Sequence, residues 1–509
     1  MKYLVGIDEG TTGCKVCLFD ENGTLVSSSY REYPSYYPHP GWVEQDIEEI
    51  RTAVFDSCKE TISKSGVNPA EISAVGYSNQ GITMVLLDKD GKVLRDHTIG
   101  WQDARNAEVL AEVQQKMTQE EYYSRTGMTL GAYNTSVLNW LKRFEPQTWE
   151  KIDRICSHQD YFLKKLGADG YFIDEASANL MCMLNVETGD WDPEVLKVYN
   201  VRYEQLPTIV HEAGKIVGTV SEDVSAQTGL PIGCKVCVGA LDTNCCTLAV
   251  GGTRPGVEVM VVGTAGTAVL ICDKAYKDPT MKVTIRTNHG MPNYQLSAMT
   301  NTAASSFRWF RDNMCGMEVA MGKLMETDPY NLITAIAAHS KPGANGVTAL
   351  TCLQGAHVRR SNDFARGTFL GVSLGTTKAD LAHAILEGIC FEMYDIMLMQ
   401  EEVGGSIDRI VLCGGVTKSD LWCQMFADIC EKPVVLMESD ELGCLGAAMY
   451  AGIGSGVYTD CDNAVARGAH VKKEYIPDAD TFSAYRKSFR RWSKSYDLLC
   501  SSYYGEEEE

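Results

Sequence analysis

The stretch "YLVGIDEGTTGCKVCLFDENGTLV", residues 3–26, decides the fold class because a turn rich in hydroxyl groups separates two short apolar segments. Apolar and β-branched residues bounded by turn residues are typical of strands. Chain reversal needs only Asn-Gly or Asp-Gly, as at the next turn, residues 21–23. The turn at residues 10–13, Gly-Thr-Thr-Gly, contains more hydroxyls and glycines than reversal requires. This excess indicates a ligand with many acceptor oxygens.

A later part of the chain repeats this pattern. The stretch "VEVMVVGTAGTAVLICD", residues 257–273, is again a predicted strand, a Gly-Thr-x-Gly turn and a second strand. It follows "GGTRPG", residues 251–256, whose composition is typical of a domain boundary. Chance recurrence is the alternative, since Gly-Thr turns are common. We predict two duplicated α/β domains, 1–250 and 257–455, presenting their turns to one polyphosphate, with a C-terminal helical extension and acidic tail at 456–509.

Composition limits the function classes that fit the chain. The 509 residues suffice for two or three domains, and the net charge of 46 − 67 = −21 argues against a nucleic-acid partner. Backbone N–H groups can still bind phosphate within an acidic protein. Asp8 and Glu9 interrupt the first apolar segment, and later apolar runs are too short for a membrane helix. We therefore expect a cytoplasmic protein with no membrane partner.

The cysteines are expected to be buried free thiols rather than metal ligands. The chain has 19 cysteines, and "GCKVC" occurs at residues 13–17 and again at 233–237. Both copies lie in segments with strand character, where residues i and i+3 point to opposite faces of the sheet. The two thiols of one copy cannot then hold the same ion.

Two aspartates stand where predicted strands end, which is where catalytic carboxylates of a phosphoryl-transfer site are expected. Asp8 directly precedes the first Gly-Thr turn, and Asp242 follows the apolar run "VCVGAL". The alternative for Asp242 is structural, because Asp242 or Thr243 can cap the helix predicted to begin there. Lys15 either neutralises a phosphate or lies in solvent. Later in the chain, Ser419 is predicted to cap a helix after the pair Gly414-Gly415, which permits close backbone approach to a ring or ribose.

Other nucleotide and hydrolase motifs are absent from the sequence. It contains no G-x-x-x-x-G-K-[ST], no G-x-G-x-x-G after a strand, no H-E-x-x-H and no G-x-S-x-G. In their place, "GIDEGTTGCKVCLFDENG", "HPGWVEQD", "GWQDAR", "GALDTN", "VVGTAGT" and "CGGVTKSDLWCQMFADI" occur in this order. The chain resembles the FGGY carbohydrate kinases from residue 3 to about residue 490. The resemblance implies two actin-like (ribonuclease H-like) domains with the active-site cleft between them, and ATP and Mg²⁺ as cofactors.

The resemblance also assigns site residues. It puts the ATP-binding motifs on Gly10, Thr11, Thr12, Gly13 and Lys15, on Gly263 and Thr264, and on Gly414, Gly415 and Ser419. Asp242 matches the catalytic base, and Asp8 and Asp242 match the Mg²⁺-associated carboxylates. The implied sugar-binding residues are Gln80, Gly81, Ile82, Asp103 and Asp242.

The substrate hairpin narrows the expected sugar. Glycerol kinases have Arg-Glu after the glutamine and xylulokinases have Met-His, whereas this chain has Gly81-Ile82. Gln80-Gly81 resembles L-xylulose kinases, and the C-terminal half resembles autoinducer-2 kinases. We expect a kinase for a small ketose or polyol, with a xylulose-type pentulose first and autoinducer-2 or erythritol as alternatives. The alternative from another class is a non-enzymatic, actin-like nucleotide sensor. The expected partner is a small sugar, and a homodimer is among the assemblies left open.

Overall fold

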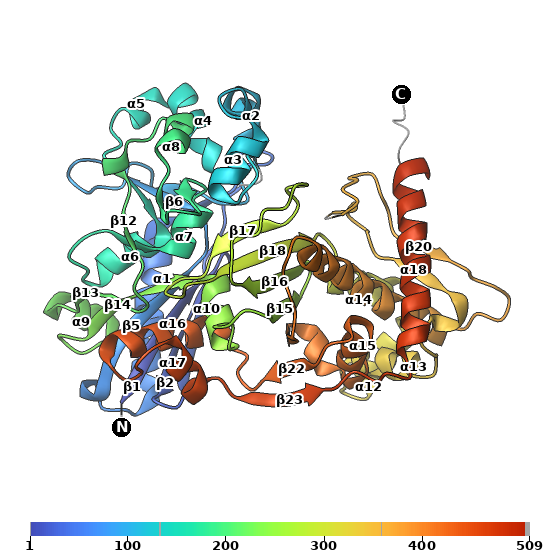
Figure 1. Ribbon diagram of the computed structural model, residues 1–509. Coiled ribbons are helices and arrows are strands. Elements are labelled where there is room, and N and C mark those ends of the chain that lie inside the picture. Colours follow the sequence, from blue (N-terminus) through green and yellow to red (C-terminus); the bar gives the residue numbers. More distant parts are fainter. Residues whose placement is uncertain (1, 132–133, 358, 504–509) are drawn as a thin grey trace.

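Two large mixed sheets, one from each half of the chain, dominate the structure. The computed structural model describes residues 2–131, 134–357 and 359–503. Figure 1 shows the first sheet with its helices on one side of the molecule and the second sheet with its helices on the other. Among the described residues, none of the helices has the length and apolar character needed to cross a membrane.

The first sheet is built around the hairpin predicted from the opening stretch. Its strand order is β13-β14-β5-β1-β2-β3. The strands are β1 (Tyr3–Glu9), β2 (Gly13–Asp20), β3 (Leu25–Glu32), β5 (Ile72–Asn79), β13 (Ile216–Thr219) and β14 (Lys235–Leu241). β1, β2 and β3 pair antiparallel, whereas β5 pairs parallel to β1 and β14 parallel to β5.

The second sheet repeats this arrangement. Its order is β17-β18-β16-β15-β21-β22-β23. The strands are β15 (Val257–Val262), β16 (Gly266–Cys272), β17 (Thr284–Thr287), β18 (Tyr294–Thr300), β21 (Arg409–Cys413), β22 (Val434–Met437) and β23 (Val471–Tyr475). β18-β16-β15-β21-β22 corresponds strand for strand to β3-β2-β1-β5-β14, with the same parallel and antiparallel pairings. The repeated hairpins therefore open two copies of one fold.

Helix α1 (Ile47–Ser65) covers one face of the first sheet, and local residues set both of its limits. The Asp46 side chain accepts hydrogen bonds from two N–H groups of the first turn, and Gly66 ends the helix with a left-handed backbone at φ 68°. Left-handed residues at helix ends are usually glycine, because a Cβ is unfavourable there. The buried face of α1 packs on β2 and β3.

Helix α16 (Leu442–Ser455) comes from the C-terminal half of the chain but packs on β1, β5 and β14 of the first sheet. The approach is close enough to require glycine in the strands. A Cβ built on Gly6 would lie 1.9 Å from the carbonyl oxygen of Cys444, and one on Gly76 would lie 2.0 Å from that of Ala447. Helix α10 (Asp242–Ala249) packs beside α16, so the two halves share one packed layer.

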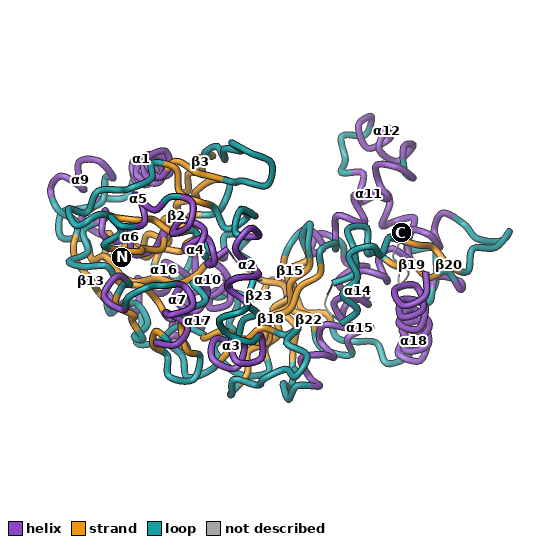
Figure 2. The backbone as a smooth tube through the Cα atoms, turned by 90° about the horizontal axis from the view of Figure 1, so that it is seen from above, coloured by secondary structure: helices purple, strands orange, loops and turns teal. Residues whose placement is uncertain are grey.

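The second sheet is covered mainly by α14 (Lys378–Glu402), which packs on β16 and β18. Figure 2 shows α11 (Ala304–Met314), α12 (Gly316–Leu324) and α18 (Phe482–Leu498) at the end of the molecule far from the first sheet. Residues after 455 include the helices α17 (Cys461–Gly468) and α18 and the strand β23, which pairs with β22. The β17–β18 hairpin reaches toward the first half and packs on α7 (Glu175–Leu180) (Figure 1).

The structure also contains further helices, and short strands that belong to neither of these two sheets. The other helices are α2 (Ala107–Gln114), α3 (Gln119–Thr126), α4 (Val137–Phe144), α5 (Pro146–Trp149), α6 (His158–Leu166), α8 (Pro193–Tyr199), α9 (Glu222–Thr228), α13 (Pro329–Ala337) and α15 (Asp420–Cys430). The other strands are β4 (Glu44–Asp46), β6 (Met84–Leu87), β7 (His97–Ile99), β8 (Arg154–Ser157), β9 (Phe172–Asp174), β10 (Leu184–Asn185), β11 (Asp190–Trp191), β12 (Thr208–Val210), β19 (Thr348–Leu350) and β20 (Thr368–Leu370). Most of α2–α8 encloses a separate apolar cluster beside the first sheet.

Candidate active site

The carboxyl ends of three parallel strands bring together the predicted catalytic and sugar residues. Asp8 of β1 lies opposite Ser78 of β5, and Ser78 lies opposite Ala240 of β14. Gln80 and Asp242 follow directly after β5 and β14. Because the strands are parallel, Asp8, Gln80 and Asp242 leave the sheet at the same edge. Ligand sites of α/β sheets usually lie at this edge.

Asp8 and Asp242 form a pair of partly buried carboxylates. Burial and the negative charge of Asp8 raise the pKa of Asp242 from its ordinary 3.8 to about 6. Burial also raises the pKa of Asp8, although a hydrogen bond from the Ser78 hydroxyl at 2.7 Å favours its charged form. Gly443 of α16 is packed against Asp8, since a Cβ there would lie 2.3 Å from Asp8 Oδ2. A carboxylate with a raised pKa near neutrality is suited to accept a proton.

The prediction that Asp242 or Thr243 caps a helix is wrong. Asp242 is the first residue of α10, and the N-cap position falls on Leu241. The Asp242 carboxylate accepts a hydrogen bond from the N–H of Thr243 at 2.5 Å. A capping Asp242 would accept from the N–H of Asn244 or Cys245, two or three residues further on, and its only recorded backbone donor is the adjacent Thr243. Its position at the strand end is thus not explained by capping.

The first Gly-Thr turn is held in place from both sides. The Gly10 N–H donates to the Gly13 carbonyl at 3.0 Å, and Gln45 Nε2 donates to the Thr11 carbonyl at 2.7 Å. Trp101 Nε1 donates to the Thr11 hydroxyl at 2.9 Å, while Thr12 is exposed. Thr12 is therefore free to contact a phosphate.

Lys15 does not lie free in solvent, which was the alternative to a phosphate-binding role. Its ammonium group pairs with the carboxylate of Glu441, which stands just before α16. The lysine is about one-third exposed, so its charge remains accessible beside the turn. The pair links the first phosphate turn to the C-terminal half of the chain.

Buried Glu9 organises the start of the sugar segment. Its side chain is fully buried and contacts His158 Nδ1 at 3.1 Å. It also accepts from Gln80 Nε2 at 2.7 Å, and the same nitrogen donates to Gln45 Oε1 at 3.0 Å. Since a carboxylate only accepts, these contacts orient the Gln80 amide with its nitrogen toward Glu9. Gln80 is thereby fixed at the sheet edge.

The residues after Gln80 are unusually constrained. A Cβ on Gly81 would lie 2.2 Å from Leu180 Cδ2, so only glycine fits without displacing Leu180. Ile82 has φ +70°, a left-handed conformation that a β-branched residue rarely adopts. Strained backbone of this kind is concentrated at functional sites. Gly81 and Ile82 thus lie beside Gln80 in a shape set by their packing.

Asp103 differs from the other predicted sugar residues, because protein groups engage both of its oxygens. One oxygen accepts from the Val43 N–H at 2.6 Å and from the Arg105 guanidinium at 2.8 Å. The other accepts from Arg105 Nε at 2.8 Å, and the side chain is fully buried. Arg105 stacks on Trp42. Asp103 therefore braces the loop that also carries Trp101, whose side chain is exposed beside the first Gly-Thr turn.

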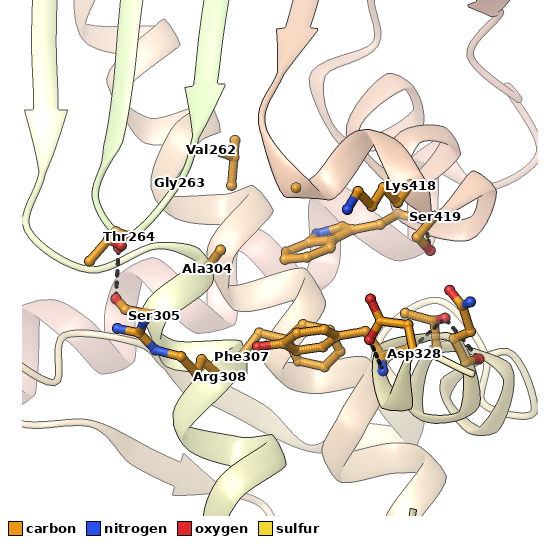
Figure 3. Close-up of a pocket in the computed structure, with 15 residues that line it drawn as sticks. Val262, Gly263, Thr264, Ala304, Ser305, Phe307, Arg308, Asp328, Lys418 and Ser419 are labelled. Atoms are coloured by element: carbon orange, nitrogen blue, oxygen red, sulfur yellow. Dashed lines mark hydrogen bonds between the residues drawn. The ribbon is translucent and has the colours of Figure 1, made fainter. Parts of the chain in front are cut away.

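The second half contains a pocket of about 300 Å³ at the carboxyl ends of β15 and β21. It is lined by Gly263 and Thr264 of the second Gly-Thr turn and by Gly415 and Ser419 (Figure 3). Ser419 caps α15 as predicted, accepting from the Trp422 N–H at 3.4 Å. Gly414, also predicted to bind ATP, is not among the lining residues; it packs against the end of β15, where a Cβ would be 2.6 Å from the Val262 carbonyl oxygen.

Several residues at these sites could not be found by motif. The pocket is also lined by Phe307, Arg308, Asp328, Tyr330, Asn331, Thr334, Lys418 and Trp422. Near the first site, the positive charge of Arg286 on β17 acts to lower the pKa of Asp242. These residues come from segments far apart in the chain. Those on helices have only amphipathic periodicity as a sequence signal, which does not distinguish a pocket wall from an ordinary surface.

The acidic pair at the sheet edge fits a magnesium ion. Mg²⁺ in phosphoryl-transfer sites is usually held by one or two carboxylates, with waters and phosphate oxygens completing the shell. Asp8 and Asp242 supply two carboxylates close enough for one to shift the other's pKa. Across the described ranges, no cluster of three or more His, Cys, Asp or Glu side chains could hold a metal alone. The sparse protein donor set is the one expected when a nucleotide shares the ion.

Comparison with known proteins decides the family. Residues 3–249 match the N-terminal domain, and residues 259–455 the C-terminal domain, of the FGGY family of carbohydrate kinases. The chain belongs to this family. It is therefore an enzyme, a carbohydrate kinase, and the resemblance noted in the sequence is confirmed.

Relatives of this FGGY kinase match along nearly its whole length. A gluconokinase of Bacillus licheniformis is 28 % identical over 490 residues, which cover 95 % of this chain and 94 % of the relative. A xylulose kinase of Bacillus subtilis (strain 168) is 26 % identical over 498 residues, 97 % of each chain. The ligand-bound xylulose kinase structure from Lactobacillus acidophilus superposes with a TM-score of 0.88 at 25 % identity, covering 99 % of both chains. The predicted two-domain, actin-like fold is confirmed.

Proposed function

We propose that this FGGY kinase transfers the γ-phosphoryl group of ATP in line to a hydroxyl of a small sugar, with Asp242 as the base. The observation that carries the proposal is the position of Asp242, partly buried at the end of β14 beside Asp8, with its pKa raised to about 6. At neutral pH this carboxylate is mostly ionised, yet it is basic enough to take a proton. A positioned base typically contributes about 10²–10⁴-fold to the rate.

In the proposed mechanism the C-terminal half of the protein binds the nucleoside, and the N-terminal half binds the transferred phosphoryl group and the sugar. The pocket lined by Thr264, Gly415 and Ser419 binds the nucleoside and its adjacent phosphates. Thr12, in the exposed part of the first turn, contacts the transferred phosphoryl group, and Lys15 neutralises part of its charge. Asp242 accepts the proton of the attacking sugar hydroxyl. Phosphoryl transfer depends mainly on such positioning and charge neutralisation.

Asp8 and Asp242 would hold Mg²⁺, which when bound offsets negative charge on the phosphates. Ser78 orients Asp8 through its hydrogen bond at 2.7 Å. Both aspartates are partly exposed at the sheet edge, so a bound sugar and nucleotide can reach them.

For the sugar we propose a xylulose-type pentulose, contacted by Gln80, Gly81 and Ile82. Support comes from the fixed Gln80 amide and the xylulose kinase relatives. Asp103 contributes by holding its loop rather than through a free oxygen. Gluconate is a second candidate, because a gluconokinase is among the relatives and the positive charge of Arg286 acts on Asp242.

A coupled ADP-release assay against pentuloses, tetruloses, polyols and gluconate tests both parts of the proposal. We expect strong stimulation by one small sugar and at least 10²-fold less product with Asp242→Asn. An Arg286→Gln variant that loses activity only on gluconate would favour the acidic sugar. A full turnover rate in Asp242→Asn on the best sugar would remove Asp242 from the role of base.

A further inference from the structure

The nucleotide pocket has two chemically different ends. Thr264 and Asp328 lie on opposite sides of the pocket in Figure 3, with Phe307 between them. The hydroxyl of the Gly-Thr turn suits phosphate oxygens, so the nucleobase of a bound nucleotide lies toward Asp328. This assignment of the ends rests on the ATP site proposed above.

Asp328 is oriented by the helix that it caps. One carboxylate oxygen accepts from the Tyr330 N–H at 3.0 Å, at the start of α13. The dashed line in Figure 3 marks this bond, and the second oxygen points away from the helix into the pocket. Pro329 at the first helical position restricts the backbone of the cap. The cap therefore presents one fixed acceptor, and no donor, to the base.

We propose that Asp328 determines nucleobase specificity by accepting a hydrogen bond from the exocyclic amino group of adenine. A 6-oxo base, as in inosine or guanosine nucleotides, has a hydrogen-bond acceptor at that position. Two acceptors cannot form a hydrogen bond, so the carbonyl oxygen and the carboxylate repel each other. A site built to pair with one polar group discriminates strongly against an analogue that leaves the pair unmade. Asn331, which lies in α13 and also lines the pocket, can form hydrogen bonds with the ring nitrogens of adenine.

Asp328→Asn tests the proposal without removing the cap. Asparagine caps helices as well as aspartate, so its side-chain oxygen continues to accept from the Tyr330 N–H. Its amide nitrogen then replaces the second carboxylate oxygen and presents a donor to the base. We expect the ratio of kcat/KM for ATP to that for ITP to fall about tenfold or more, because a charged acceptor becomes a neutral donor.

Asp460→Asn is the matched control. Asp460 is also an exposed aspartate that caps a helix, accepting from the Asn463 N–H at 2.8 Å, and it lies outside the pocket. This variant should leave the ATP/ITP ratio unchanged. Thermal unfolding of both variants checks that each remains folded.

The outcomes separate this inference from the proposed function. An unchanged ATP/ITP ratio in Asp328→Asn would overturn the assignment of Asp328 to the base. A loss seen with ATP but absent with 2′-deoxy-ATP would assign Asp328 to the ribose and also overturn it. Should no sugar stimulate ADP release in the wild-type enzyme, the proposed function fails. Calorimetric titration with ATP and ITP would then still test the base preference.

Discussion

Replacing Asp242 by asparagine should abolish most activity and at the same time stabilise the protein above neutral pH. The pKa of Asp242 is about 6 in the folded chain against an ordinary 3.8, and one pKa unit corresponds to about 1.36 kcal/mol. The difference is therefore worth about 3 kcal/mol. The residue is partly exposed, so solvent screening makes this figure an upper bound.

The sign of the effect follows from the raised pKa. The neutral carboxyl is compatible with burial, so its contribution to stability is fully present below pH 3.8 and is lost as the pH rises through about 6. Asparagine does not titrate and keeps the hydrogen bond from Thr243. The gain in unfolding free energy should thus approach about 3 kcal/mol at pH 8, with about half of it at pH 5.

The assay is urea unfolding of both proteins at pH 5 and pH 8, in EDTA and without nucleotide, so that no metal ion offsets the carboxylate pair. Activity on the best sugar is measured in parallel, and kcat should fall about 10²-fold or more. An Asn variant that is less stable than the wild type at pH 8 would refute the picture of a destabilised, charged Asp242. The same result at both pH values would refute the assigned pKa.

Further variants and measurements test the two phosphate turns, the closure of the two halves around substrates and the packing of α16. Thr12→Val or Thr264→Val should weaken Mg·ATP far more than sugar, and unchanged nucleotide binding by calorimetry in both would reject the two-turn phosphate site. Solution scattering should give a smaller radius with sugar plus a non-hydrolysable ATP analogue, since the two turns lie on different sheets; an unchanged radius would count against closure. Gly76→Ala should cost more than about 3 kcal/mol, because its Cβ would overlap α16, whereas Gly316→Ala, with open space around its Cβ, should be neutral or stabilising. Equal melting temperatures for these two variants would contradict the close packing of α16.

Local signals in the sequence predicted much of the framework. The two Gly-Thr hairpins and the Ser419 cap each depend on a few adjacent residues, and the structure agrees with them. In contrast, the docking of α16 could not be predicted. Its sequence "LGCLGAAMYAGIGS" is small and apolar on all sides, so no single buried face is indicated.

The candidate site was predictable in part for the same reason. Asp8 and Asp242 stand at strand ends, which sequence patterns reveal. Asp328 and Arg286 reach their sites through packing between distant segments, which a single sequence does not encode locally. For Asp103 the sequence motif could be recognised, but the hydrogen bonds from Arg105 and Val43 that occupy its carboxylate could not be predicted.

The packing of α16 on the first sheet has a consequence for synthesis on the ribosome. The strands of that sheet are complete once residue 241 has emerged, but the helix that covers β1, β5 and β14 begins at residue 442. At a synthesis rate of about 5–20 residues per second, this face of the sheet remains uncovered for roughly 10–40 s. During that interval the glycine-lined strands expose a flat apolar surface to other nascent chains and to chaperones. The N-terminal half should therefore aggregate when expressed alone and become soluble when residues 442–455 are supplied in trans or by circular permutation.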